Sequence, residues 1–297
     1  MAFRRRDGFV WQLRTRSLEL GRRTLVMGVL NVTPDSFSDG NLFLGPEAAT
    51  AQALRMLDEG ADFVDIGGES TRPGKYEPVS AEEEQRRILP VIAAVLKART
   101  DAILSIDTYK ASTAQMAVDA GAEIVNDISA LKWDAEMAAT CARLACGVVL
   151  MHTRGKSAEW QSLERLAPEE LMPLVKRDLA QSLQVALDAG IERDRIMLDP
   201  GYGFGKSFDE NYRLLARQDE LRELGRPILA GVSRKSFLGR RLAEFHGGSD
   251  APVSERGNAS IAATAAAILA GAHIVRVHDV RPAAEAARIA DAILEAV

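Results

Sequence analysis

Three short polar side chains, Asp107, Asn126 and Asp199, come at the ends of apolar runs rich in β-branched residues. Carboxylates buried side by side are costly unless hydrogen-bond donors satisfy them. A flat heterocycle with several N–H groups, such as a 2-amino-4-oxopyrimidine ring, would supply those donors. Lys235 follows another such run and could offset the negative charge. These residues therefore predict a slot for a donor-rich ring.

Cationic side chains form a second group at similar positions: Arg72, Arg276 and His278, with Lys235 shared. A forked guanidinium matches a phosphate group bidentately. These residues predict an anion clamp beside the ring slot. Purely structural roles remain open for residues of both groups. Asp107 could cap the following helix, and Arg276 could pair with Asp279.

The elements that must position these residues alternate along the chain. Eight short apolar runs predict buried parallel strands, at 25–30, 63–66, 103–106, 124–125, 148–151, 196–198, 227–230 and 274–277. Amphipathic segments between and after them predict helices over 46–59, 111–120, 134–145, 168–189, 208–217, 258–270 and 282–297, and one more after a Ser80–Glu83 capping box. Eight β/α units favour a single α/β domain, a closed (β/α)8 TIM barrel, over an open doubly wound sheet.

The prediction divides the chain into an N-terminal arm, residues 1–24, and the barrel, residues 25–297. Residues 9–20 are expected to form a short hairpin that closes the bottom of the barrel. The polar residues listed above would then lie just past the carboxyl ends of the strands, where such barrels carry their active sites.

Composition narrows the class of protein further. The 297 residues carry 37 basic and 42 acidic side chains, a net charge of −5, and only 5% are aromatic, which argues against nucleic acid as the main partner. The two cysteines cannot form a disulfide framework, which fits a reducing compartment. Neither a membrane span nor a signal peptide is expected. A cytoplasmic enzyme or small-molecule binder is the expectation.

The sequence resembles the dihydropteroate synthase family, which binds pterins, over about residues 24–297. Seven blocks carry the resemblance: MGVLNVTPDSFSD at 27–39, DIGGESTRPG at 65–74, SIDT at 105–108, NDIS at 126–129, DPGYGFGK at 199–206, SRKSFLG at 233–239 and RVHDV at 276–280. Each block is moderately specific alone. All seven in order, each at a predicted strand end, are highly specific.

The resemblance implies a transferase of folate biosynthesis that joins 4-aminobenzoate to 6-hydroxymethyl-7,8-dihydropterin diphosphate and releases pyrophosphate, with Mg²⁺. It implies a pterin site of Asp107, Asn126, Met151, Asp199 and Lys235. It implies a diphosphate site of Asn31, Arg72, Arg276 and His278, with Asn31 also a magnesium ligand, and an aminobenzoate site of Phe37, Thr71, Pro73, Gly203, Phe204 and Ser233. Asp107, Lys235, Arg276 and His278 would contribute most to catalysis.

The family also implies sulfonamides as competing ligands and a homodimer. The alanine-rich helix expected over 258–270 could pack against a second subunit, although burial against its own strands would explain it equally well. Departures from the family pattern fall in loops, at Asn41 and at 153–155. The alternatives are a methyltetrahydrofolate:corrinoid methyltransferase and a catalytically silent pterin-binding paralogue.

Overall fold

The computed structural model describes residues 3–33, 45–69 and 78–297 of the chain. Eight parallel strands form one sheet in the order β8-β7-β6-β5-β4-β3-β10-β9. The strands are β3 (Leu25–Asn31), β4 (Phe63–Gly67), β5 (Leu104–Asp107), β6 (Ile124–Asp127), β7 (Gly147–Met151), β8 (Ile196–Asp199), β9 (Leu229–Ala230) and β10 (Ile274–Val277). A parallel bridge between Leu198 and Ile228 brings the two edges together. The sheet is therefore a nearly closed barrel, and the predicted (β/α)8 fold is confirmed.

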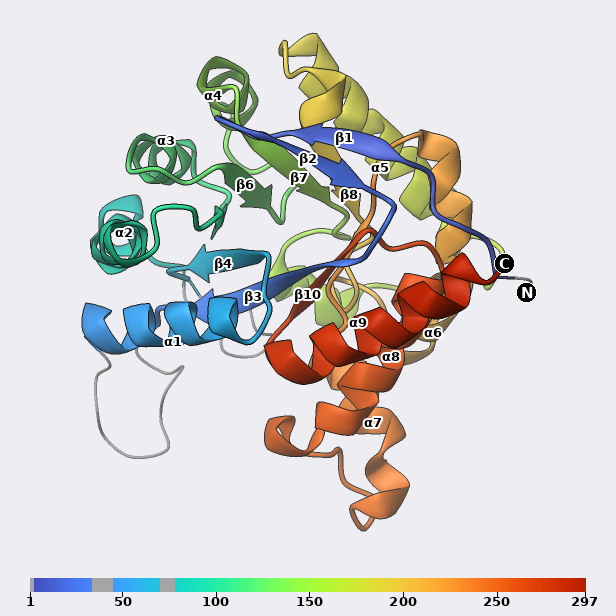
Figure 1. Cartoon of the computed structure of the whole chain (residues 1–297). Coiled ribbons are helices and arrows are strands. Elements are labelled where there is room, and N and C mark those ends of the chain that lie inside the picture. The colour runs from blue at the N-terminus through green and yellow to red at the C-terminus, as the bar shows by residue number, and fades with distance from the viewer. Residues whose placement is uncertain (1–2, 34–44, 70–77) are drawn as a thin grey trace.

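Helices cover the outside of this barrel (Figure 1). They are α1 (Pro46–Asp58), α2 (Ala81–Ala98), α3 (Ala111–Asp119), α4 (Met137–Leu144), α5 (Leu171–Asp188), α6 (Phe208–Ala216), α7 (Ser236–Arg241), α8 (Gly257–Leu269) and α9 (Val280–Glu295). Short 3-10 helices add η1 (Ser157–Ser162), η2 (Arg193–Arg195), η3 (Gln218–Leu224), η4 (Ala243–Phe245) and η5 (Val253–Glu255). Within the described residues, no helix is long and apolar enough to cross a bilayer.

The apolar periodicity of the helices explains how they cover the strands. In α2, Ile88, Val91, Ile92 and Val95 are fully buried and form one face toward the sheet. Ser80 begins this helix as predicted, since its hydroxyl accepts a hydrogen bond of 3.2 Å from the Glu83 N–H. The predicted capping box is only half formed, because the Glu83 carboxylate binds Arg86 and Arg87 instead of the Ser80 N–H. Such one-sided burial places the helices outside the barrel and leaves the strand ends free to carry polar groups.

An antiparallel hairpin of β1 (Phe9–Gln12) and β2 (Ser17–Leu20) closes the amino end of the barrel. Its Trp11 side chain is fully buried and packs edge-on against Phe63, with 6.2 Å between the ring centres. Its Nε1 donates to the Arg195 carbonyl at 2.8 Å. The hairpin lies across the barrel in Figure 1 and shares a cluster of buried side chains with the strands. The predicted hairpin is confirmed.

Several boundaries differ from the predicted ones, for local reasons. The fourth helix begins at Met137 rather than 134, because the Asp134 carboxylate accepts from the backbone N–H groups of Ala111 and Glu136. The last helix begins at Val280, two residues earlier than expected. The short helix α7, directly after the seventh strand end, was not predicted at all. Its six residues are too few to show a clear apolar period.

Candidate active site

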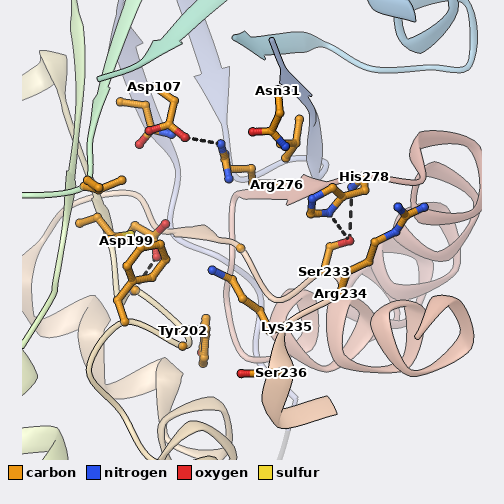
Figure 2. A pocket seen from close by; sticks show the side chains of 18 of the residues that line it. Asn31, Asp107, Asp199, Tyr202, Ser233, Arg234, Lys235, Ser236, Arg276 and His278 are labelled. Carbon is orange, nitrogen blue, oxygen red and sulfur yellow. Dashed lines mark hydrogen bonds and ion pairs between the residues drawn. The ribbon is translucent and has the colours of Figure 1, made fainter. Parts of the chain in front are cut away.

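A cavity of about 350 Å³ opens at the carboxyl ends of the strands, within the size range of small-molecule sites. All predicted site residues that the structure describes line it: Asn31, Asp107, Asn126, Met151, Asp199, Gly203, Phe204, Ser233, Lys235, Arg276 and His278. The remaining predicted site residues, Phe37, Thr71, Arg72 and Pro73, lie outside the described residues. Figure 2 shows side chains from the β3, β5, β8, β9 and β10 ends converging on one space.

Arg276, at the end of β10, joins two carboxylates across the barrel. Its Nε donates to Asp65 at 2.6 Å and its Nη2 donates to Asp107 at 2.7 Å. The alternative that Arg276 pairs with Asp279 is wrong, since Asp279 binds Arg234 instead. Burial acts to lower the pKa of Arg276, but the charges of Asp65 and Asp107 outweigh it and raise that pKa. Arg276 is therefore a permanent cation at the centre of the site.

Asp65 belongs to this group, although sequence reasoning gave it no role. It lies inside β4, is fully buried, and accepts from Asn126 Nδ2 at 2.9 Å as well as from Arg276. Its Oδ1 has no partner among the described residues. The signal was present in the sequence, because a carboxylate within an otherwise apolar buried strand requires a paired donor.

Asp107 and Asp199 face the same cavity from the ends of β5 and β8, which β6 and β7 separate in the sheet. Burial raises the pKa of Asp107, which the Arg276 guanidinium opposes. Burial also raises the pKa of Asp199, whose Oδ1 accepts from the Gly201 N–H at 2.7 Å. Asp107 does not cap α3, because Lys110 occupies the cap position and Asp134 satisfies the first N–H group of that helix. Both carboxyl groups are thus available to a ligand with N–H donors.

Lys235 enters the cavity from the opposite side and extends toward Asp199 (Figure 2). Its ammonium lies 4.1 Å from the centre of the Phe204 ring, a cation–π contact. Burial, with the Arg276 charge, lowers the pKa of Lys235 to about 8. An aromatic ring and a cation therefore form one wall of the cavity.

The glycine-rich loop after β8 is held by Lys206. Its Nζ donates to the carbonyls of Gly201 at 2.7 Å, Phe204 at 3.2 Å and His152 at 3.3 Å. Gly203 has a φ of +84°, and a Cβ there would lie 3.2 Å from Lys235 Cδ. The loop backbone therefore approaches the site closely, and Lys206 fixes its path.

The cationic edge of the cavity lies at the ends of β9 and β10. His278 Nδ1 lies 3.1 Å from the Ser233 hydroxyl, which also accepts the His278 backbone N–H at 3.2 Å. Asn31 presents its carboxamide from the end of β3 (Figure 2). Among the described residues, no cluster of three His, Cys, Asp or Glu side chains could hold a metal ion by itself.

Sequence reasoning missed some of the residues that line the cavity. Trp160 of η1 packs edge-on against Phe204 at 5.2 Å, and Arg234 and Arg256 complete the wall near α7. Trp160 lies in an irregular segment without periodicity, so the sequence carried no signal for its position. Arg234 stood between two predicted site residues and was detectable.

Comparisons with known proteins identify one family. A family model described as pterin binding enzyme matches residues 27–278. The dihydropteroate synthase of Clostridium beijerinckii is 42% identical over 281 residues, which cover 94% of this chain and 98% of that protein. The solved structure of Xanthomonas albilineans dihydropteroate synthase with 4-aminobenzoic acid is 41% identical, covers 98% of this chain and 100% of that one, and has a TM-score of 0.86. The structure of the Yersinia pestis dihydropteroate synthase in a sulfonamide drug complex is 39% identical in sequence. It covers 97% of this chain and 100% of that one, with a TM-score of 0.88.

Proposed function

The chain belongs to the dihydropteroate synthase family, and we propose that it condenses 6-hydroxymethyl-7,8-dihydropterin diphosphate with 4-aminobenzoate, giving 7,8-dihydropteroate and pyrophosphate. One observation carries this proposal beyond family membership. The acceptors Asp107, Asn126 and Asp199 line one cavity together with the cations Lys235 and Arg276. The buried Asp65 supports them by accepting from Asn126 and Arg276. That arrangement suits a ring rich in donors attached to an anionic leaving group.

The acceptors hold the pterin ring. Asp107, Asn126 and Asp199 face the cavity and can accept from the amino and ring N–H groups of a pterin, and Met151 packs beside it. The Arg276 guanidinium keeps the Asp65 and Asp107 carboxylates in place. A guanidinium has five N–H donors, so the two bonds to carboxylates leave donors for phosphate.

The cations stabilise the leaving group. When the bond from the pterin methylene carbon to the diphosphate oxygen breaks, its electrons leave with pyrophosphate, and negative charge grows near Asn31, Arg276 and His278. Positive charge grows on the pterin, where the nearby carboxylates stabilise it. The substitution is dissociative, with pyrophosphate leaving before or as the new carbon–nitrogen bond forms.

Magnesium would bind at this edge together with the diphosphate. Mg²⁺ binds few protein oxygens and takes most of its remaining ligands from phosphates and water, so a single carboxamide at Asn31 is a suitable protein ligand. When bound, the ion neutralises the charge that develops on pyrophosphate. Magnesium binding by Asn31 is part of the proposal.

4-Aminobenzoate lies against Gly203, Phe204 and Ser233, which line the cavity. Phe37, Thr71 and Pro73 belong to the same proposed site and lie outside the described residues. Its amine carries its own lone pair, so the reaction needs no activated serine or cysteine. We propose that sulfonamides compete for the same site. Inhibition that is competitive toward 4-aminobenzoate would support this, and an enzyme indifferent to sulfonamides would contradict it.

A homodimer and a cytoplasmic location complete the proposal. Helix α8 keeps Ala262 and Ala266 exposed on its outer face, which suits packing against a second subunit. Light scattering on the purified protein would distinguish a dimer from a monomer. The corrinoid methyltransferase and the silent paralogue are not favoured, since the relatives matched over nearly their whole length are dihydropteroate synthases.

Pyrophosphate release tests the function. The purified chain should release pyrophosphate from the pterin diphosphate in a way that depends on 4-aminobenzoate, and 7,8-dihydropteroate should accumulate with it. A chain that forms no dihydropteroate under these conditions does not have the proposed function.

A further inference from the structure

A two-bond ion pair connects the two loops that carry the cationic edge of the site. Arg234 Nη2 donates to Asp279 Oδ1 at 2.5 Å, and its Nε donates to Oδ2 at 3.1 Å. Arg234 stands between Ser233 and Lys235, and Asp279 directly follows His278. Arg234 lies beside Ser233 and His278 in Figure 2. The pair therefore ties the β9 loop to the β10 loop at the edge of the cavity.

Asp279 makes this pair at the expense of a helix cap. It occupies the N-cap position of α9, where aspartate is among the preferred residues because its side chain can accept from the first N–H groups. The Asp279 side chain makes no such cap bond. The Ser80 hydroxyl, by contrast, does cap α2. The Asp279 carboxylate is thus diverted from its ordinary local role.

Arg234 is also held in an unfavourable state. Its φ is +57°, in the left-handed region that residues with a Cβ avoid. Its backbone N–H donates to the Ser260 hydroxyl at 2.8 Å, and its carbonyl accepts from Arg256 Nη1 at 3.1 Å. The conformation of Arg234 is therefore fixed by three residues: Ser260 in α8, Arg256 just before α8, and Asp279.

The ion pair beside the site thus joins an aspartate that does not cap its helix to an arginine with a strained backbone. Strained backbone persists where its surroundings over-determine it, and such residues cluster at functional sites. We infer that Asp279 is a positioning residue: by holding Arg234 left-handed, it aims Ser233 toward His278 and Lys235 into the cavity. The inference rests on the proposed function, because Ser233, Lys235 and His278 are the groups being positioned.

The variant Asp279→Asn tests this inference. Asparagine has the same size and is an equally good N-cap, but it lacks the charge that holds Arg234. We expect kcat/KM to fall about 10- to 100-fold, since small displacements of positioned groups have effects of that order. The KM for 4-aminobenzoate should rise, and the melting temperature should stay the same or increase. Asp58→Asn, which breaks the surface pair of Asp58 with Arg99, is the matched control and should leave kcat/KM unchanged.

Arg234→Gly provides an independent variant, because glycine relieves the strain of a positive φ but lacks the side chain by which Asp279 holds the loop in place. It should keep or raise the melting temperature and lower kcat/KM about as much as Asp279→Asn. The double variant should lose no more than either single one, since both break the same interaction. Full activity in both single variants, or losses that multiply in the double variant, would overturn the inference. Losses of activity that follow losses of stability would show a merely structural pair. An inactive parent enzyme would instead overturn the proposed function.

Discussion

At the scale of single residues, the site depends on how one cation is shared. Arg276 was expected to bind diphosphate, and the structure pairs it with Asp65 and Asp107. The proposed binding of diphosphate is compatible with this pairing, because a guanidinium has five N–H donors and the pairs with Asp65 and Asp107 use only two of them. We therefore expect Asp65 to influence the reaction through Arg276 and Asn126, since it does not line the cavity itself.

Replacing Asp65 by Asn should therefore impair catalysis. The change removes a charged hydrogen bond worth about 1.5–3 kcal/mol, so kcat/KM should fall about 10- to 150-fold. Asp62→Asn is a suitable control, since Asp62 lies just before the start of β4 and pairs with Arg23 near the hairpin. Steady-state kinetics of the two variants would check this. If the Asp65→Asn and Asp62→Asn variants were equally active, Asp65 would have no role in catalysis.

Lys235 predicts the alkaline limb of the pH profile. Burial lowers its pKa to about 8, so it is charged below that pH and loses its proton as the pH rises through it. Activity that depends on the ammonium should therefore decline above about pH 8. Arginine stays charged at all accessible pH values, so Lys235→Arg should move the limb to higher pH, whatever its effect on the maximum rate. A limb that stays in place would assign it to another group.

At the scale of elements, the loop after β8 shows how backbone geometry makes the wall of the site. Gly201 has a φ of +67°, and a Cβ there would lie 1.9 Å from the His152 carbonyl oxygen. Gly247, in the turn after α7 and η4, has a φ of +63° with nothing within 4 Å of such a Cβ. The two glycines share a conformation and differ in the space around them.

This difference predicts unequal effects of alanine. Gly247→Ala should cost about 1 kcal/mol of unfolding free energy, the ordinary penalty of a left-handed residue with a Cβ. Gly201→Ala should cost several times as much and also lower activity, because either β7 or the loop must move. Urea denaturation of both variants would measure the contrast. Similar stabilities would mean that the loop adapts easily.

The same elements show how far the sequence predicts the structure. Apolar runs predicted all eight barrel strands, because strands buried on both faces leave a continuous apolar signal. Positions at the strand ends then placed Asp107, Asp199 and Arg276 in one cavity. The short helix α7, the Trp160 contact and the Arg234–Asp279 pair were not predictable, since they depend on tertiary contacts between loops rather than on periodicity.

At the scale of the whole molecule, buried structural contacts close the amino end of the barrel, and the cavity lies at its carboxyl end. The hairpin and a buried His273 occupy the amino end, opposite the cavity. His273 Nδ1 accepts from the Ile228 N–H at 3.1 Å, and its other ring nitrogen lies 3.0 Å from the Asp7 carbonyl. Burial lowers the pKa of His273 to about 4.

This histidine makes the fold sensitive to acid. The unfolded chain binds a proton near pH 6.5, whereas the native protein resists it down to about 4, so stability falls as the pH drops between these values. The difference amounts to about 3 kcal/mol at most. His273→Gln, which keeps a donor and an acceptor, should reduce this pH dependence. The buried His152, whose pKa burial lowers to about 3, should account for part of what remains. Unfolding free energies at pH 7 and pH 4.5 would test it.

We propose that the two substrates are joined in the cavity at the carboxyl ends of the barrel strands. The most direct measurement is the amount of 7,8-dihydropteroate and pyrophosphate formed by the purified chain and by its Arg276→Ala variant. We expect equal amounts of both products from the parent enzyme and a kcat/KM about 10- to 150-fold lower in the variant, because the variant loses a charged interaction. Pyrophosphate without dihydropteroate, or a fully active variant, would contradict it.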